Sequence, residues 1–104
     1  MKPYKDPCNT LTWRLFELPE PILEHPFAKG VGRKFRFDYC WPQFMVAVER
    51  EGGIWMRGGG GHSHPMWIER DMEKGNLAAK LGWRVFRFTP RQLKTGEAQA
   101  FMKS

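Results

Sequence analysis

Alternating apolar and polar residues predict three β-strands in this chain. In the segments FRFDYCW (residues 35–41) and MVAVERE (residues 45–51), residues of similar polarity recur at every second position, which is the period of a strand with two different faces. A third segment, WRVFRF (residues 83–88), is rich in aromatic and β-branched residues. A short extended piece is expected at residues 24–27. The aromatic face of the first strand carries Phe35, Phe37, Tyr39 and Trp41.

Helical periodicity is strongest over residues 66–81, where Gly82 is placed to end the helix. Prolines crowd the N-terminal region and leave room for only a short helix near residues 11–18. A last short helix is expected over residues 89–93, with a frayed tail after Gly96.

The order of these elements predicts an α/β fold in a single domain, residues 1–104. The first two strong strands are close enough in sequence to form an antiparallel hairpin. The long helix then joins the second strand to the third in a strand–helix–strand unit, whose connection should be right-handed and whose strands should be parallel. The sheet is therefore expected to be mixed.

Asp38 and Glu49 are the strongest candidates for a functional pair. If a two-residue loop at positions 43–44 closes the hairpin, Asp38 lies directly opposite Glu49. Opposed side chains share a face with Cβ atoms roughly 4.5–5.5 Å apart, and like charges there destabilise the sheet. A hard divalent cation such as Mg²⁺ would offset that repulsion. Glu51, on the same face, could add a carboxylate or accept a proton.

A structural explanation of these acids is also open. The sheet face could be solvated, with its acids neutralised by basic side chains. In the expected register Arg36 lies opposite Glu51, and an exposed ion pair of this kind contributes little to stability.

Two charged residues, Asp71 and Lys74, fall on the sheet-facing side of the long helix. They could pair with each other at a spacing of three residues. Alternatively, Lys74 could extend its ammonium group toward the carboxylates, where it would hold a phosphate or position a water molecule. The apolar residues expected on this side are Trp67, Ile68, Gly75, Ala78 and Leu81, and the solvent stripe consists of Glu69, Glu73, Asn76 and Lys80.

The balance of charge favours a polyanionic partner. The chain has 17 lysines and arginines against 11 acids, a net charge of +6, and in so small a domain this indicates nucleic acid first. Cys8 and Cys40 have no metal-like spacing and are expected to be reduced thiols. Without an apolar leader or a stretch of ~20 apolar residues, we expect a cytoplasmic protein that makes no membrane contact.

Residues 52–65 form a glycine-rich loop that contains His62 and His64. No G-K-[ST] sequence follows the glycines, so a phosphate-binding P-loop is excluded. The two histidines could bind zinc, but no further ligands at usable spacing accompany them. His62 could instead assist at a phosphate, or both could be ordinary loop residues.

Four blocks of the sequence together resemble small, phage-associated endonucleases of the PD-(D/E)XK type. The blocks are RKFRFDYCWP, VAVEREGGIW, GH and DMEKGNLAAKLGWRVFRFT, in this order, over roughly residues 24–96. The layout is similar to that of very-short-patch-repair-like nucleases. The resemblance implies a restriction-endonuclease-like α-β-β-β-α-β core with a mixed sheet.

The resemblance also implies a metal site. The leading aspartate of the family corresponds to Asp38 and the first E-x-K acid to Glu49, which would hold Mg²⁺, or Mn²⁺ in its place, together with Glu51. Because Glu51 stands where the family has lysine, the lysine would come from the following helix as Lys74. The upstream acid of the family corresponds to Glu24.

Further residues follow from the same resemblance. The histidine after the glycines corresponds to His62, and where related sequences read G-R-H this chain has GGH, so an arginine contact to phosphate is missing or comes from Arg57. The metal would lower the pKa of a water molecule and polarise the scissile phosphate, while Glu51 or Lys74 orients the nucleophile. The basic residues expected to hold the DNA backbone are Arg33, Lys34, Arg57, Arg84, Arg87, Arg91 and Lys94.

The expected activity is hydrolysis of DNA that is structure-selective or weakly sequence-specific. RNA as the substrate, a homodimer, and one or two metal ions are alternatives that the sequence leaves open. Two other classes of protein also stay open: a non-enzymatic DNA-binding accessory protein, and a zinc-dependent nucleic-acid-binding module built on His62 and His64.

Overall fold

The computed structural model describes residues 10–51 and 65–103. The strands and the long helix expected from the sequence are found there, with ends shifted by no more than two residues. In chain order the elements are α1 (Thr10–Leu15), β1 (Ile22–His25), η1 (Lys29–Val31), β2 (Phe37–Trp41), η2 (Pro42–Phe44), β3 (Val46–Arg50), α3 (Pro65–Lys80), β4 (Arg84–Phe88), α4 (Pro90–Thr95) and α5 (Glu97–Lys103), where η marks a 3-10 turn.

The strands form one mixed sheet in the order β1-β2-β3-β4. The pairs β1–β2 and β2–β3 are antiparallel, and β3–β4 is parallel. The helix α3 is therefore the crossover between two parallel neighbours, as the sequence predicted, and the fold is α/β. Across residues 10–51 and 65–103, every helix is too short or too polar to cross a membrane.

The β2–β3 hairpin has the register that the sequence predicted. Cys40 pairs with Ala47, so Asp38 comes opposite Glu49 two residues further from the turn. The connection is longer than the two-residue loop expected: η2 forms a 3-10 turn over Pro42–Phe44, and Met45 follows it in the left-handed region with φ 55°.

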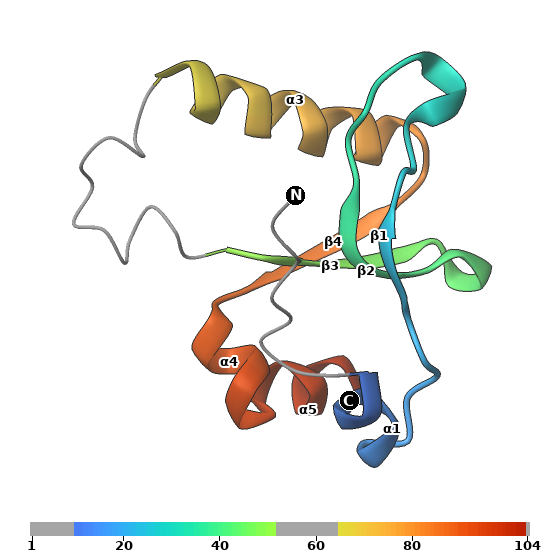
Figure 1. The fold of residues 1–104 in the computed structure, drawn as a ribbon, viewed down its shortest axis with the longest axis vertical. Helices are drawn as coiled ribbons and strands as arrows, with labels where there is room; N and C mark the ends of the chain where they lie inside the picture. Colours follow the sequence, from blue (N-terminus) through green and yellow to red (C-terminus); the bar gives the residue numbers. More distant parts are fainter. Residues whose placement is uncertain (1–9, 52–64, 104) are drawn as a thin grey trace, which may run out of the picture.

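Helices cover both faces of the sheet (Figure 1). The helix α3 lies on one side, and α1, α4 and α5 lie on the other. Each side has its own apolar cluster. The cluster on the side of α1, α4 and α5 consists of Trp13, Tyr39, Trp41, Val48, Phe88, Leu93 and Ala98, and the cluster on the side of α3 consists of Phe37, Cys40, Ala47 and Ala78.

The aromatic residues of β2 do not share one face, so that expectation was wrong. Tyr39 and Trp41 belong to the cluster with Leu93, whereas Phe37 belongs to the cluster under α3 and stacks on Phe27 with ring centroids 3.9 Å apart. Phe37 is the first residue of β2 and pairs with His25 of β1. Its ring is packed at the end of the sheet by Phe27 and Trp83.

The sheet-facing side of α3 is less buried than its periodicity suggested. Ala78 is fully buried, but Trp67 is 53% exposed and Ile68 is also exposed. The reason is length: a helix of 16 residues spans about 24 Å, whereas the five-residue strands β3 and β4 span about 17 Å. The sheet therefore covers only the C-terminal part of α3.

The C-terminal region is helical rather than frayed, which corrects the expectation for residues beyond Gly96. Gly96 ends α4 in the left-handed conformation with φ 92°, and α5 follows directly. Ala98 is fully buried in the cluster that contains Leu93, and Met102 packs against it four residues later. This contact, rather than intrinsic helix propensity, stabilises so short a helix.

We expect Leu93→Ala to reduce the free energy of unfolding by about 2–5 kcal/mol, because it opens a cavity in the cluster that joins the sheet to the C-terminal helices. Leu93 is fully buried. Leu15→Ala is the matched control, since Leu15 is 81% exposed and its loss should change stability by no more than about 0.5 kcal/mol. Urea unfolding followed by circular dichroism measures both. Equal effects of the two substitutions would contradict the packing described for α4 and α5.

Candidate functional site

Asp38 and Glu49 are held together by the main chains of their two strands. The N–H of Asp38 donates to Glu49 Oε2 at 2.9 Å, and the N–H of Arg50 donates to Asp38 Oδ2 at 2.7 Å. Each carboxylate is therefore fixed by the strand that carries the other. The predicted proximity of these acids is present, and their orientation is set by the backbone.

Lys74 connects this pair to α3. Its Nζ forms an ion pair with Glu49 Oε1, and its side chain is 20% exposed. The sequence left two partners open for Lys74, and the structure places it at Glu49 rather than at Asp71. One carboxylate from β2, one from β3 and the ammonium group from α3 therefore lie within one site.

The Glu49 carboxyl group is buried, with 7% of the residue exposed. Burial raises the pKa of Glu49 because it disfavours the charged form. The Lys74 ammonium group and the N–H of Asp38 act in the opposite direction, while the negative charge of Asp38 raises the pKa further. The net direction is upward, so burial and the neighbouring acid outweigh the lysine.

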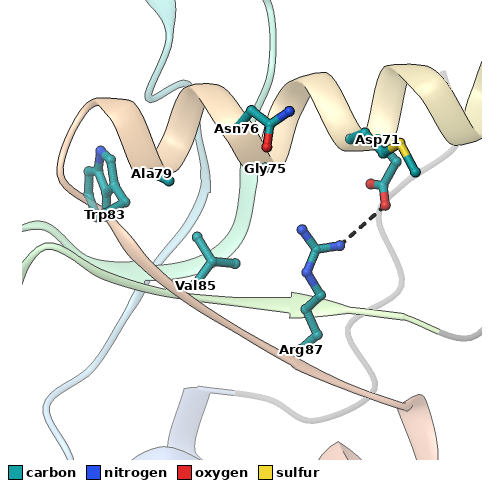
Figure 2. A pocket seen from close by; sticks show the side chains of 8 residues that line it. Asp71, Gly75, Asn76, Ala79, Trp83, Val85 and Arg87 are labelled. Carbon is teal, nitrogen blue, oxygen red and sulfur yellow. Dashed lines mark hydrogen bonds and ion pairs between the residues drawn. The ribbon is translucent and has the colours of Figure 1, made fainter.

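Glu51 belongs to a second ion-pair group. Arg87 Nη1 donates to Glu51 Oε2 at 2.5 Å. It also donates to Asp71 Oδ2 at 3.2 Å (Figure 2). Two expectations are thereby corrected: Glu51 pairs with Arg87 rather than with Arg36, and Asp71 pairs with Arg87 rather than with Lys74. The cause is the parallel register of β3 and β4, which places Arg87 beside Glu49 and within reach of Glu51.

Gly75 leaves space for Arg87 beneath α3. A Cβ atom at Gly75 would lie 2.9 Å from Arg87 Nη2, and Figure 2 shows the guanidinium group directed at this part of the helix. A hollow of about 560 Å³ lies here between α3 and β4, and its lining includes neither Asp38 nor Glu49. Helix periodicity places Gly75 on the sheet-facing side, where a glycine inside a helix often marks close packing.

Glu24 has an unusual backbone conformation in β1. The register of β1 and β2 places it at the level of Asp38, between the pairs Leu23–Tyr39 and His25–Phe37. Its φ is 55°, which is rare for a residue other than glycine, and such strain is often found at functional sites. The predicted additional acid thus lies on the strand next to Asp38.

The predicted metal site is a carboxylate pair rather than a larger group. Within the described parts of the chain, no three or more His, Cys, Asp or Glu side chains are arranged to hold a metal ion. Glu51, expected as a third ligand, is bonded to Arg87. Asp38 and Glu49 lie together, whereas Glu51 lies in the ion-pair group of Arg87.

The residues expected to contact DNA lie in different surroundings. Arg33 pairs with Glu73 and lies over the ring of Phe35, 4.6 Å from its centroid. Arg87 is engaged by two acids, whereas Lys34 lines a separate hollow beside Lys74. Arg57, His62 and His64 lie outside the described residues. Arg84, Arg91 and Lys94 are exposed.

Two proteins of Mycobacterium tuberculosis, from strains CDC 1551 and H37Rv, are similar to part of this chain. Both are uncharacterized proteins, and each is 31% identical to it over 68 residues. The matched segment covers 65% of this chain but 23% of each relative, so the chain spans about a quarter of their length. No protein-family model and no solved structure matches the chain.

We expect Glu49→Gln to alter how the stability of the metal-free protein depends on pH. Because the pKa of Glu49 is raised on folding, its contribution to stability is greatest below the ordinary glutamate pKa of about 4.3 and falls as pH rises through the folded-state pKa. Glutamine does not titrate. The free energy of unfolding of the variant should therefore rise relative to wild type across this window.

Urea unfolding of both proteins between about pH 4 and pH 8 measures this difference. Glu69→Gln, which removes an exposed carboxylate on α3, is the control for the loss of one surface charge. A difference for Glu49→Gln that is constant or decreases with pH would contradict the raised pKa.

Proposed function

We propose that the protein is a metal-dependent endonuclease that hydrolyses DNA phosphodiester bonds with Mg²⁺, or with Mn²⁺ in its place. One observation carries the proposal: Asp38 and Glu49 lie side by side on neighbouring strands, and Lys74 reaches Glu49 from α3. Two carboxylates with a nearby ammonium group suit the hydrolysis of a phosphodiester, because carboxylates bind a hard cation and the ammonium group stabilises negative charge.

The donor atoms of Asp38 and Glu49 fit a Mg²⁺ ion. Asp38 Oδ2 and both oxygens of Glu49 are already hydrogen-bond acceptors, but a carboxylate offers about four acceptor sites. Lone pairs therefore remain for an ion that takes one or two carboxylates and completes its shell with water and phosphate oxygens. When bound, such an ion lowers the pKa of water and stabilises charge on the phosphate.

Lys74 supplies a fixed positive charge at this site. Its ammonium group can hold a non-bridging phosphate oxygen or orient the attacking water, and its ion pair with Glu49 sets its position. Glu51, at the motif position where the family has lysine, is bonded to Arg87. This placement supports Lys74, rather than Glu51, as the residue that takes the role of the motif lysine.

The arrangement of elements supports the same class of enzyme. Among the helices and strands of residues 10–51 and 65–88, the order is α-β-β-β-α-β, leaving the 3-10 turns aside, and this agrees with the order expected of a restriction-endonuclease-like core. The two acids come from adjacent strands, and the lysine comes from the helix that follows. The net charge of +6 suits a DNA substrate, recognised through its structure or through weak sequence preference.

A non-enzymatic DNA-binding protein is the second candidate. Main-chain groups bond Asp38 and Glu49, and Arg87 bonds Glu51, so these acids have partners without a metal ion. In this interpretation the acids stabilise the hairpin, and the positive charge alone binds DNA. A test of cleavage separates the two candidates.

We expect Asp38→Asn and Glu49→Gln each to reduce Mg²⁺-dependent cleavage of plasmid DNA by at least about a hundredfold, or about 2.7 kcal/mol in barrier height, because each removes a metal ligand. DNA binding in EDTA should change little. Glu69→Gln on the exposed side of α3 is the control and should cleave normally. Cleavage by either variant at the wild-type rate would contradict the proposed metal site. Undiminished cleavage by the wild-type protein in excess EDTA would contradict it as well.

We expect Lys74→Met, in protein that circular dichroism shows to be folded, to cleave at least about tenfold more slowly, a loss of about 1.4 kcal/mol in transition-state stabilisation. Methionine keeps much of the aliphatic stem and the helix propensity of lysine, so the lost charge is the main change. Lys80→Met is the matched control, because Lys80 is exposed on the same helix. Single-turnover cleavage measures both, and equal rates for Lys74→Met and wild type would refute the role of Lys74.

A further inference from the structure

A basic hollow lies beside the candidate site, on the same side of the sheet as α3. It has a volume of about 350 Å³, within the roughly 300–1,000 Å³ common for small-ligand sites. Its walls come from α3 and from the segment that precedes β2. The lining residues are Lys34, Phe35, Arg36, Trp67, Arg70, Asp71 and Lys74.

The charge of the basic hollow favours an anion. Its lining carries four cationic side chains against one carboxylate. The carboxylate, Asp71, is bonded to Arg87, and Lys74 is bonded to Glu49. Lys34, Arg36 and Arg70 thus contribute positive charge beyond these two ion pairs, and a phosphate group would satisfy it.

Phe35 supports two of the cations near the hollow. It is buried, and the guanidinium groups of Arg33 and Arg70 lie over its ring at 4.6 Å and 5.7 Å from the centroid. A guanidinium group over an aromatic ring is attracted by the negative face of the ring. Arg70 is therefore held at the hollow by a surface of the protein, which reduces the entropy lost when it binds an anion.

Trp67 adds a different kind of contact. It lines the hollow and is 53% exposed because α3 extends beyond the strands at this end. An exposed indole next to cations is the combination by which proteins bind single-stranded nucleic acid, where each stacked base contributes roughly 1–3 kcal/mol. A base inside a duplex is already stacked and paired, so only an unpaired nucleotide can offer its face to Trp67.

We propose that the basic hollow binds one unpaired nucleotide of a single-stranded polynucleotide. The base lies against Trp67, and the phosphate lies among Lys34, Arg36 and Arg70. Lys74 lines the hollow and contacts Glu49, so the next phosphate along the strand would lie close to the carboxylate pair. Where it concerns cleavage, the inference rests on the proposed nuclease function, and it predicts that the substrate is DNA with unpaired segments such as flaps. Binding of the nucleotide does not depend on the nuclease function.

The test is equilibrium binding in EDTA, where the proposed cleavage cannot occur. Fluorescence anisotropy of a labelled DNA oligonucleotide, single-stranded or annealed to its complement, gives the two dissociation constants. Trp67→Ala should weaken binding of the single strand about tenfold and binding of the duplex less than about twofold. Trp67→Phe should restore most of the affinity, because it keeps an aromatic face. Circular dichroism checks that each variant is folded.

Two controls separate stacking from charge. Phe44→Ala removes another exposed aromatic residue, 57% exposed in η2, and should leave both affinities unchanged. Arg70→Met should weaken binding of both the single strand and the duplex. It should also reduce the salt dependence of the binding constant by about one phosphate contact. An oligoribonucleotide of the same sequence distinguishes DNA from RNA as the source of the strand, and tight binding of either supports the inference.

The outcomes distinguish this inference from the proposed function. If Trp67→Ala binds the single strand as tightly as wild type, or loses single-strand and duplex affinity equally, the inference is overturned even if Mg²⁺-dependent cleavage is observed. If the Trp67 effect is selective for single strands but no DNA is cleaved with any metal ion, the binding site stands and the nuclease assignment falls.

Discussion

The buried carboxylate of Glu49 is the constraint on which the rest of the site depends. A buried charge is destabilising unless other groups pair with it and hydrogen-bond to it. One oxygen of Glu49 accepts the N–H of Asp38, and the other binds Lys74. The apolar cluster under α3 fixes the C-terminal part of the helix through Ala78. The ion pair with Glu49 fixes it one turn earlier, so that two strands and a helix are joined at a polar contact.

The features that follow from short-range rules could be predicted from the sequence. The hairpin register depends on a short loop and the two-residue period of strands, and it placed Asp38 opposite Glu49 as found. The direction of Lys74 follows from the period of an α-helix. The partner of Glu51 could not be predicted, because it depends on how β4 is aligned with β3 across a long connection. That register brings Arg87, and not Arg36, to Glu51.

Three further differences arise from packing that a sequence pattern does not contain. Helix periodicity identifies a face but not how far the sheet extends beneath it, so Trp67 was expected to be buried and is exposed. Alternation fails at Phe37, whose ring packs against Phe27 and Trp83 in the cluster under α3. The last helix is too short to be stable alone, and tertiary contacts such as the burial of Ala98 and Gln99 stabilise it.

At Gly75 the requirements of the helix and of the sheet beneath it meet in one residue. In a helix interior, alanine is more stable than glycine by roughly 1 kcal/mol. A methyl group at this position would lie 2.9 Å from Arg87 Nη2, so the end of that flexible side chain would have to shift. The same guanidinium group bonds Glu51 and Asp71 through Nη1. A substitution chosen for the helix alone would therefore also act on the ion pairs that join helix and sheet.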